Sequence, residues 1–291
     1  MDDPRQALRA HGFIKKHSLG QHFLSDPALL ARLVDAAGVT PQDDVLEIGP
    51  GSGALTLALA ARARRVVAVE IDRALMPVLQ QTLAPWANTQ VVWGDIRRVD
   101  LEALMAGYFG GRCKVVANLP YYITTEVLQR LLLYRLPVDT LAVMVQREVG
   151  QKMLAEPGGD GYGPLAVYCR YFALTRQALA VPAACFSPPP KVDSVFMRLD
   201  MLQAPPLPCA DEALFLRVVR AAFAMRRKTL ANNLRAAFAL DKVQATLCAQ
   251  AAGVDPGVRG EALDIPAFIR VADVLAKKIS QPGRNKRIDS E

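Results

Sequence analysis

The fold of this chain is decided by the stretch EIGPGSG at residues 47–53, which joins an apolar run to a helix-forming run through three closely spaced glycines. The apolar run at 45–48 predicts a buried strand, and the spacing of apolar residues over 55–63 predicts a helix. Glycines at such a turn let the backbone bend tightly and approach a ligand at the helix N-terminus. The stretch therefore predicts a strand–turn–helix unit with a ligand site where the strand ends.

Further apolar runs and helix-period segments alternate around this stretch. Strands are predicted at 66–69, 91–93, 115–117 and 141–145, and helices around 29–34 and at 75–83 and 127–133. Apolar runs that lack polar alternation and are separated by helices indicate a parallel sheet covered on both faces. We therefore predict an α/β fold with a Rossmann-like, doubly wound sheet, whose ligands gather at the carboxyl ends of the strands.

A proline-rich segment at 204–208 predicts a domain boundary. Helical periodicity without a convincing strand follows it at 214–224, 230–238, 242–252 and 265–277. We expect a basic, mobile N-terminal arm, a Rossmann-like domain, a smaller all-helical C-terminal domain and a polar tail, with bounds at 1–20, 21–203, 204–280 and 281–291.

Composition and charge exclude several classes of protein. The 291 residues carry a net charge of +7, and residues 201–291 hold 14 basic against 9 acidic side chains, which favours a polyanionic partner such as nucleic acid. The five cysteines form no C-x-x-C pair and the three histidines all precede residue 23, so we predict no disulfide framework and no metal site. No apolar run approaches 18 residues, and the N-terminus lacks the basic region of a signal peptide. We expect a cytoplasmic protein without a membrane segment.

Carboxylates follow two of the predicted strands. Glu70 ends the second strand, where a carboxylate can accept both hydroxyls of a ribose, and Asp95 follows the third, where it can accept the exocyclic amine of adenine. The glycine turn also fits a dinucleotide pattern. Pro50 removes one backbone N–H from that turn, a poor feature for holding a pyrophosphate. An adenosine cofactor without phosphate, S-adenosylmethionine, is therefore favoured.

The fourth strand ends in Asn118-Leu119-Pro120-Tyr121, the most specific signal in the sequence. The Asn118 side-chain oxygen and the Leu119 carbonyl can accept the two N–H groups of an exocyclic adenine amine, which aims its lone pair at a sulfonium methyl. The Tyr121 ring offers a surface on which the base can stack. Phe186, before a proline-rich segment, is either a second stacking face for an extruded base or a core residue of an ordinary turn.

Taken together, these motifs resemble the ribosomal RNA adenine dimethyltransferase family, in particular its bacterial small-subunit members. The resemblance runs from about residue 15 to about residue 278 and includes, besides the segments above, 18–24, 70–72, 146–149, 162–163, 186–194 and 226–230. It implies an enzyme that transfers methyl groups from S-adenosylmethionine to N6 of two adjacent adenosines near the 3′ end of 16S small-subunit rRNA. The expected partner is an immature small ribosomal subunit, and we expect the protein to be a monomer.

The resemblance also implies roles for individual residues. Gln21, His22 and Leu24 would enclose the methionine end of the cofactor. The rest of the cofactor would be held by Gly49, Gly51, Glu70, Ile71, Asp95, Ile96 and Asn118, and the target adenine by Asn118, Leu119, Tyr121 and Phe186. RNA phosphates would be contacted by Lys15, Lys16, Lys191, Arg226, Arg227 and Lys228. The chain departs from the family at His22, where asparagine is frequent, and at Pro164, where a basic residue is common.

Three alternatives stay open at this point. The first is a large-subunit rRNA methyltransferase that confers antibiotic resistance, because such enzymes carry a similar Asn-Leu/Ile-Pro-Tyr/Phe motif. The second is a non-catalytic assembly factor that binds immature subunits, and the third is a dinucleotide-dependent oxidoreductase. Methylation assays on isolated subunits and a cofactor-binding screen distinguish them.

Overall fold

A computed structural model describes residues 4–14 and 21–279 and divides the chain into two compact units. The first unit covers Met1–Leu154 and Tyr168–Gln203, and the second covers Ala155–Val167 and Ala204–Glu291. The sequence placed 155–167 in the Rossmann-like domain, whereas the structure groups this segment with the helical unit. The reason is a long-range contact, because the Tyr162 hydroxyl donates a hydrogen bond to the Leu263 carbonyl at 2.9 Å.

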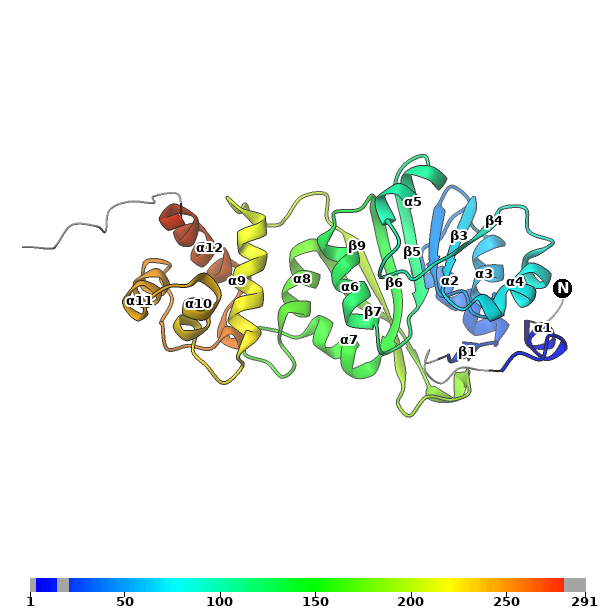
Figure 1. Ribbon diagram of the computed structural model, residues 1–291. Helices are drawn as coiled ribbons and strands as arrows, with labels where there is room; N and C mark the ends of the chain where they lie inside the picture. The colour runs from blue at the N-terminus through cyan, green and yellow to red at the C-terminus, as the bar shows by residue number, and fades with distance from the viewer. Residues whose placement is uncertain (1–3, 15–20, 280–291) are drawn as a thin grey trace, which may run out of the picture. The chain divides into compact units, whose positions relative to one another are not determined.

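The first unit is built on a mixed sheet (Figure 1). Its strands, within the described residues, are β2(Asp44–Ile48), β3(Arg65–Glu70), β4(Thr89–Trp93), β5(Cys113–Asn118), β6(Val138–Gln146), β7(Ala173–Val181) and β9(Ser194–Met201). Their order is β4-β3-β2-β5-β6-β9-β7, with the first five parallel and β9 and β7 antiparallel to their neighbours. The predicted doubly wound sheet is confirmed, and two antiparallel strands extend it.

Helices flank this sheet and connect its strands. They are α1(Pro4–Ala10), α2(Pro27–Ala37), α3(Ala54–Ala60), η2(Arg73–Leu75), α4(Met76–Leu83), α5(Leu101–Tyr108), α6(Thr124–Leu133), α7(Arg147–Leu154) and η3(Ala183–Cys185). The helix α8(Pro164–Phe172) crosses the boundary between the two units. A separate pair, β1(Phe23–Leu24) and β8(Phe186–Ser187), is antiparallel.

The alternation of side chains along the strands gives the sheet two apolar faces. Ala142, Met144 and Phe196 belong to one core cluster with apolar side chains of α2 and α3. Side chains adjacent to these in the sequence, such as Val195, point to the opposite face of the sheet. On that face, a Cβ on Gly150 of α7 would lie 2.4 Å from Val195 Cγ2, so α7 packs closely against the sheet. Because both faces of the sheet are covered, β2, β5 and β6 are buried along nearly their whole length.

The sequence analysis did not predict the strand β7, which lies at the edge of the sheet. Arg176 and Gln177 in its middle are exposed, and the pairing with β9 shifts register between Gln177 and Leu179. The run therefore shows neither continuous burial nor regular alternation. Pairing with a distant strand, rather than local preference, defines it.

The N-terminal segment 4–14 is not the mobile arm that the sequence predicted. Residues 4–10 form α1, which contacts α4 and fully buries Ala7. His11 Nε2 shares a hydrogen bond of 2.9 Å with Gln81 Oε1, and the Phe13 ring packs edge-on against Phe23 at 6.2 Å. Lys15 and Lys16 lie outside the described residues, as does the predicted tail at 281–291.

The second unit is helical, as the sequence predicted. Beyond residue 204 its elements are α9(Glu212–Ala224), α10(Leu230–Phe238), α11(Lys242–Ala251), η4(Gly260–Ala262) and α12(Ile265–Ile279). Side chains of Asp211, Thr229 and Asp241 cap the first three helices by accepting backbone N–H groups. Across 4–14 and 21–279, no helix combines the length and apolar character needed to span a membrane.

Candidate active site

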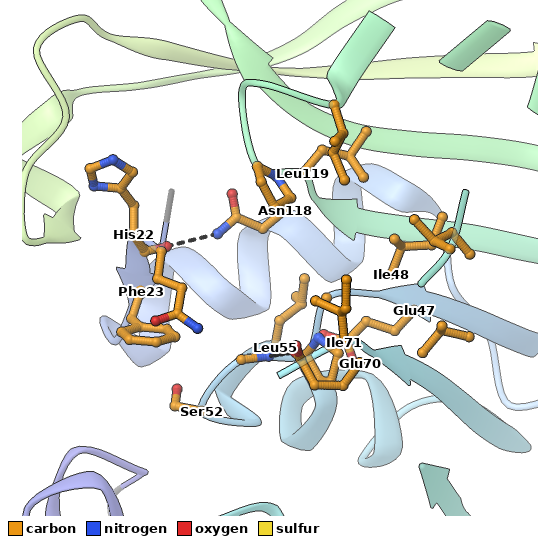
Figure 2. Close-up of a pocket in the computed structure, with 18 of the residues that line it drawn as sticks. His22, Phe23, Glu47, Ile48, Ser52, Leu55, Glu70, Ile71, Asn118 and Leu119 are labelled. Atoms are coloured by element: carbon orange, nitrogen blue, oxygen red, sulfur yellow. Dashed lines mark hydrogen bonds between the residues drawn. The ribbon is translucent and has the colours of Figure 1, made fainter. Parts of the chain in front are cut away.

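A cavity of the first unit lies at the switch point of the sheet, where the strand order reverses. The chain proceeds from β2 through β3 to β4 in one direction and from β5 to β6 in the other, so β2 and β5 are neighbours. Gly49 follows β2 and Asn118 ends β5, and a Cβ on Gly49 would lie 3.9 Å from the Asn118 carbonyl oxygen. Figure 2 shows Glu47 and Glu70 on one side of this cavity and Asn118 near His22 on the other.

Nearly all of the predicted cofactor and catalytic residues of the first unit meet in this cavity. The predicted residues that line it are Gln21, His22, Leu24, Gly49, Gly51, Glu70, Ile71, Asp95, Ile96, Asn118, Leu119 and Tyr121. Phe186 is the exception. It is only 4% exposed, belongs to the core cluster beneath α2 and α3, and does not line the cavity.

The glycine turn brings bare backbone into the cavity. Gly51 has φ of +57°, and a Cβ at this position would lie 2.8 Å from Cε1 of Phe23. Gly53, with φ of +84°, is the N-cap of α3, and a Cβ at this position would lie 3.0 Å from Cγ2 of Thr82. A side chain at either position would be strained and would collide, so the turn depends on glycine.

Glu70 is buried at the end of β3, where backbone donors hold it. Its Oε2 accepts the Gly51 N–H at 3.1 Å and its Oε1 accepts the Asp72 N–H at 2.8 Å. Burial raises the pKa of the Glu70 carboxyl, and these backbone hydrogen bonds partly offset the rise. Asp72 in turn accepts a hydrogen bond from Gln21 Nε2 at 3.0 Å, which ties the N-terminal segment to the end of β3.

Asp95 sits after β4 in an ion pair that the sequence did not predict. Arg97 grips both of its carboxylate oxygens, with Nη2 at 2.6 Å from Oδ2, and this contact lowers the pKa of Asp95. Arg130 of α6 fixes the same loop by donating to the carbonyl oxygens of Ile96 and Val99. Arg97 lies two residues after Asp95, so the sequence could have indicated this ion pair. Arg130 is far from Ile96 and Val99 in the sequence, so its contacts with them could not be predicted.

The Asn118 side chain is oriented by a backbone carbonyl. Its Nδ2 donates a hydrogen bond of 3.0 Å to the carbonyl oxygen of His22 (Figure 2). Because a carbonyl can only accept, this contact determines which end of the amide is the nitrogen. The amide oxygen is turned away from that carbonyl and is the end available as an acceptor.

The ring that faces Tyr121 is that of His22. The two rings are stacked with a centroid distance of 5.7 Å and an interplanar angle of 27°, and Phe186 meets the His22 ring edge-on at 6.5 Å. His22 Nδ1 lies 2.7 Å from the Pro188 carbonyl oxygen, so this nitrogen carries the proton. The Tyr121 hydroxyl is 2.8 Å from Ser194 Oγ, and burial raises its pKa.

Glu47 is the residue to which sequence reasoning gave no role. It is 1% exposed, lines the cavity, and neither carboxyl oxygen has a hydrogen-bond partner in the described part of the chain. Burial raises its pKa to about 8, and the charge of Glu70 adds to the rise. An orphaned acid beside Glu70 and a glycine cradle suits a nucleoside ligand that also carries positive charge, as S-adenosylmethionine does.

The predicted RNA-binding residues lie outside this cavity. Lys191 is exposed in the loop that precedes β9. Arg226, Arg227 and Lys228 are exposed in the turn between α9 and α10 of the second unit.

The doubly wound sheet and the cavity at its switch point, lined by a glycine turn, Glu70 and Asp95, are typical of S-adenosylmethionine-dependent methyltransferases. Within that class, the sequence matches the ribosomal RNA adenine dimethylase family over residues 12–277. The chain belongs to this family, and the predicted resemblance is confirmed. It is therefore an enzyme, its cofactor is S-adenosylmethionine, and its substrate is ribosomal RNA.

Full-length relatives agree with this assignment. The ribosomal RNA small subunit methyltransferase A of Moorella thermoacetica is 46% identical over 275 residues, which cover 92% of this chain and 95% of the relative. The protein of the same name from Shouchella clausii is 43% identical over 272 residues and 92% of both chains.

Two solved structures share the fold over most of their length. A dimethyladenosine transferase from Plasmodium falciparum aligns with a TM-score of 0.72 at 25% identity, covering 88% of this chain and 98% of its own. The 23S rRNA methyltransferase ErmE aligns with a TM-score of 0.64 at 27% identity, covering 87% and 99%.

Proposed function

We propose that this protein dimethylates N6 of two adjacent adenosines near the 3′ end of 16S small-subunit rRNA, acting as a monomer on an immature subunit in the cytoplasm. The names of its full-length relatives support the choice of the small subunit. The observation that carries the chemistry is the orientation of the Asn118 amide, which its hydrogen bond to His22 leaves with an acceptor for the target amine.

The cofactor side of the cavity holds the nucleoside through carboxylates. Glu70 accepts the ribose hydroxyls, with Ile71 against the sugar, and Asp95 with Ile96 holds the adenine. Gly49 and Gly51 let the backbone approach, while Gln21, His22 and Leu24 enclose the methionine end. All of these residues line one cavity. When bound, the cofactor supplies an electrophilic methyl group on a positively charged sulfur.

On the target side, neutral acceptors hold the adenine amine. The Asn118 oxygen and the Leu119 carbonyl accept its two N–H groups, which counteracts delocalisation of the nitrogen lone pair into the ring. Asn118 cannot take a proton, and the Tyr121 hydroxyl stays protonated because burial raises its pKa. The amine therefore loses its proton to water after it is alkylated, and the protein contributes positioning and electrostatics rather than a general base.

The target base stacks on Tyr121, whose ring is anchored through the hydrogen bond of its hydroxyl to Ser194. The second face is the His22 ring, which must move away from Tyr121 to admit the base because the two ring centroids are only 5.7 Å apart, and Phe186 meets the His22 ring from its edge. The role of Phe186 as a stacking face remains a prediction. Exposed Lys191, Arg226, Arg227 and Lys228 contact RNA phosphates, a role that Lys15 and Lys16 share in the sequence-based prediction.

Transfer of tritiated methyl groups to isolated subunits tests the proposal. Unmodified small subunits should accept label and yield N6,N6-dimethyladenosine on nucleoside analysis, whereas large subunits should not. Label on large subunits alone would instead assign the reaction of ErmE, whose fold the chain shares. Tight binding of small subunits without turnover would assign an assembly factor.

A further inference from the structure

Tyr122 carries a large ring at the mouth of the cavity, next to Tyr121. It is 54% exposed to solvent, yet it lines the same cavity as Asn118 and Leu119. The cofactor and target sites described above give this ring no role. A single exposed aromatic ring is ordinary on a protein surface, so its significance depends on where it lies and how firmly it is held.

A closed turn holds Tyr121 and Tyr122 in different directions. The Ile123 N–H donates to the Pro120 carbonyl oxygen at 3.1 Å, which closes the turn around the two tyrosines, and the chain continues directly into α6. Tyr121 is half-buried, with its hydroxyl 2.8 Å from Ser194 Oγ, whereas Tyr122 is exposed. One ring therefore faces inward and the next faces outward from the same turn.

The surroundings of Tyr122 suit a nucleic acid. Arg97 also lines the cavity, and Asp95 raises the pKa of its guanidinium with a smaller contribution from Tyr122, so the phenol and the guanidinium lie near each other. Within 4–14 and 21–279, no other ring or guanidinium stacks on Tyr122. Tyr134, at the opposite end of α6 and 57% exposed, already lies 5.5 Å beneath the Arg130 guanidinium. Tyr122 therefore presents an uncovered aromatic face beside a cation.

Extrusion of a target base leaves its neighbour in the RNA strand without a stacking partner. Where the target and the neighbour are both adenosines, two large aromatic surfaces separate, and this loss opposes entry of the target into the cavity. An aromatic side chain at the mouth can replace the lost partner, because every base has a face on which a ring can stack. A purine neighbour gains more from such a ring than a pyrimidine, since its stacking surface is larger.

We propose that the Tyr122 ring stacks on the base adjacent to the target adenosine and takes the place of the extruded base in the strand. This inference rests on the proposed function and adds the chemistry of the neighbouring nucleotide to it. Tyr121 and His22 hold the target base, and Tyr122 holds its neighbour. The preferred substrate is therefore an adenosine whose neighbour on the Tyr122 side is also a purine.

A matched pair of variants tests the role of the ring in steady-state methyl transfer to unmodified small subunits. Tyr122→Leu keeps an apolar side chain but loses the ring, and it should raise KM about fivefold with little change in kcat. Tyr122→Phe keeps the ring and should behave as the wild type. Tyr134→Leu removes a similarly exposed ring outside the cavity and should leave KM unchanged. Thermal unfolding checks that each variant is folded.

The salt dependence of subunit binding separates stacking from phosphate contact. Stacking releases no counterions, so Tyr122→Leu should weaken subunit binding while the slope of log affinity against log salt stays at the wild-type value. Filter binding over a range of salt concentrations measures this slope. A shallower slope would assign Tyr122 to the RNA backbone and overturn the proposal.

Subunits reconstituted with altered 16S rRNA test the assignment to the neighbouring base. Each of the two adenosines is replaced in turn by uridine, which stacks more weakly. In one of these two substrates the KM penalty of Tyr122→Leu should fall from about fivefold to less than about twofold, and that substrate identifies the neighbour. A penalty of about fivefold in both substrates, or a raised KM in Tyr122→Phe, overturns the proposal.

The same assay distinguishes failure of this inference from failure of the proposed function. If the wild type does not label small subunits, the proposed function fails and the role of Tyr122 fails with it. If the wild type and Tyr122→Leu label them with the same KM, only the role of Tyr122 is overturned.

Discussion

The two sides of the cavity differ in charge although the same sheet builds both. The side that follows β2, β3 and β4 presents the acids Glu47, Glu70 and Asp95, of which the first two are almost completely buried. The side that follows β5 presents Asn118 and Tyr121, both neutral and both fixed by hydrogen bonds to other parts of the chain.

The difference in charge between the two sides fits the two ligands of the proposed reaction, the cofactor and the target adenine. A cationic cofactor is stabilised by carboxylates, and a site of low dielectric strengthens that attraction. The target amine needs acceptors that hold its protons without removing them, which a neutral amide and a backbone carbonyl provide. In the proposed function, acids on one side and neutral acceptors on the other separate cofactor binding from activation of the amine, and the separation can be tested residue by residue.

The largest expected effect is at Asn118. Asn118→Ala should reduce methyl transfer to unmodified small subunits by about 1,000-fold, because one of the two acceptors for the target amine is lost. Tritium incorporation under single-turnover conditions measures the change, and thermal unfolding checks that the fold is intact. Asn118→Asp is the matched control, since it keeps an acceptor but loses the donor to the His22 carbonyl. Near-normal transfer by Asn118→Ala would remove this residue from the mechanism.

The next effect is expected at Glu70, on the acidic side. Glu70→Ala should weaken cofactor binding by about 100-fold, because charged hydrogen bonds to the ligand are lost and the Gly51 N–H loses its acceptor. Calorimetry measures the dissociation constant. Turnover at saturating cofactor should fall much less than in Asn118→Ala. A loss of turnover as large as that of Asn118→Ala, with cofactor affinity retained, would contradict the division between the two sides.

A smaller effect is expected in the second unit, where the charge is positive. Replacing Arg226, Arg227 and Lys228 together by alanine should weaken RNA binding by about tenfold at moderate salt. The slope of log affinity against log salt should become shallower by about 2–3, because fewer phosphate counterions are released. Cofactor affinity should not change, which serves as the internal control. An unchanged salt slope would exclude this cluster from the RNA interface.

The smallest effect compares two rings near Tyr121. His22→Ala should raise KM for small subunits about fivefold through lost stacking, while its backbone carbonyl still orients Asn118. Phe186→Leu should cost about 1 kcal/mol of stability as a core substitution and change KM little. Denaturant unfolding measures the change in stability, and kinetics with small subunits measure the change in KM. A large KM effect confined to Phe186→Leu would restore Phe186 as the stacking face.

The sequence alone predicted which candidate site residues lie together, because parallel strands bring their carboxyl ends to one edge. Gly49, Glu70, Asp95 and Asn118 each follow a recognisable strand, so local pattern sufficed to place them together. Glu47 was visible in the same pattern. Its lack of a partner was not, because that depends on everything packed around it.

Contacts between distant segments were beyond the reach of the sequence. The stacking of His22 on Tyr121 and the contact of His22 with Pro188 join residues about one hundred or more positions apart. The assignment of 155–167 to the helical unit and the packing of 4–14 against α4 have the same origin.

The succession of strands from β2 to β6, the glycine turn and the identity of the polar groups at each of these strand ends were therefore predictable from the sequence itself. The tertiary structure decided which amide atom of Asn118 bonds to the His22 carbonyl, which ring opposes Tyr121 and which buried acid has no hydrogen-bond partner within 4–14 and 21–279. The physical reason is that hydrogen-bond direction, ring stacking and desolvation depend on atoms only a few ångströms apart in space, and these atoms come from segments that only folding brings together.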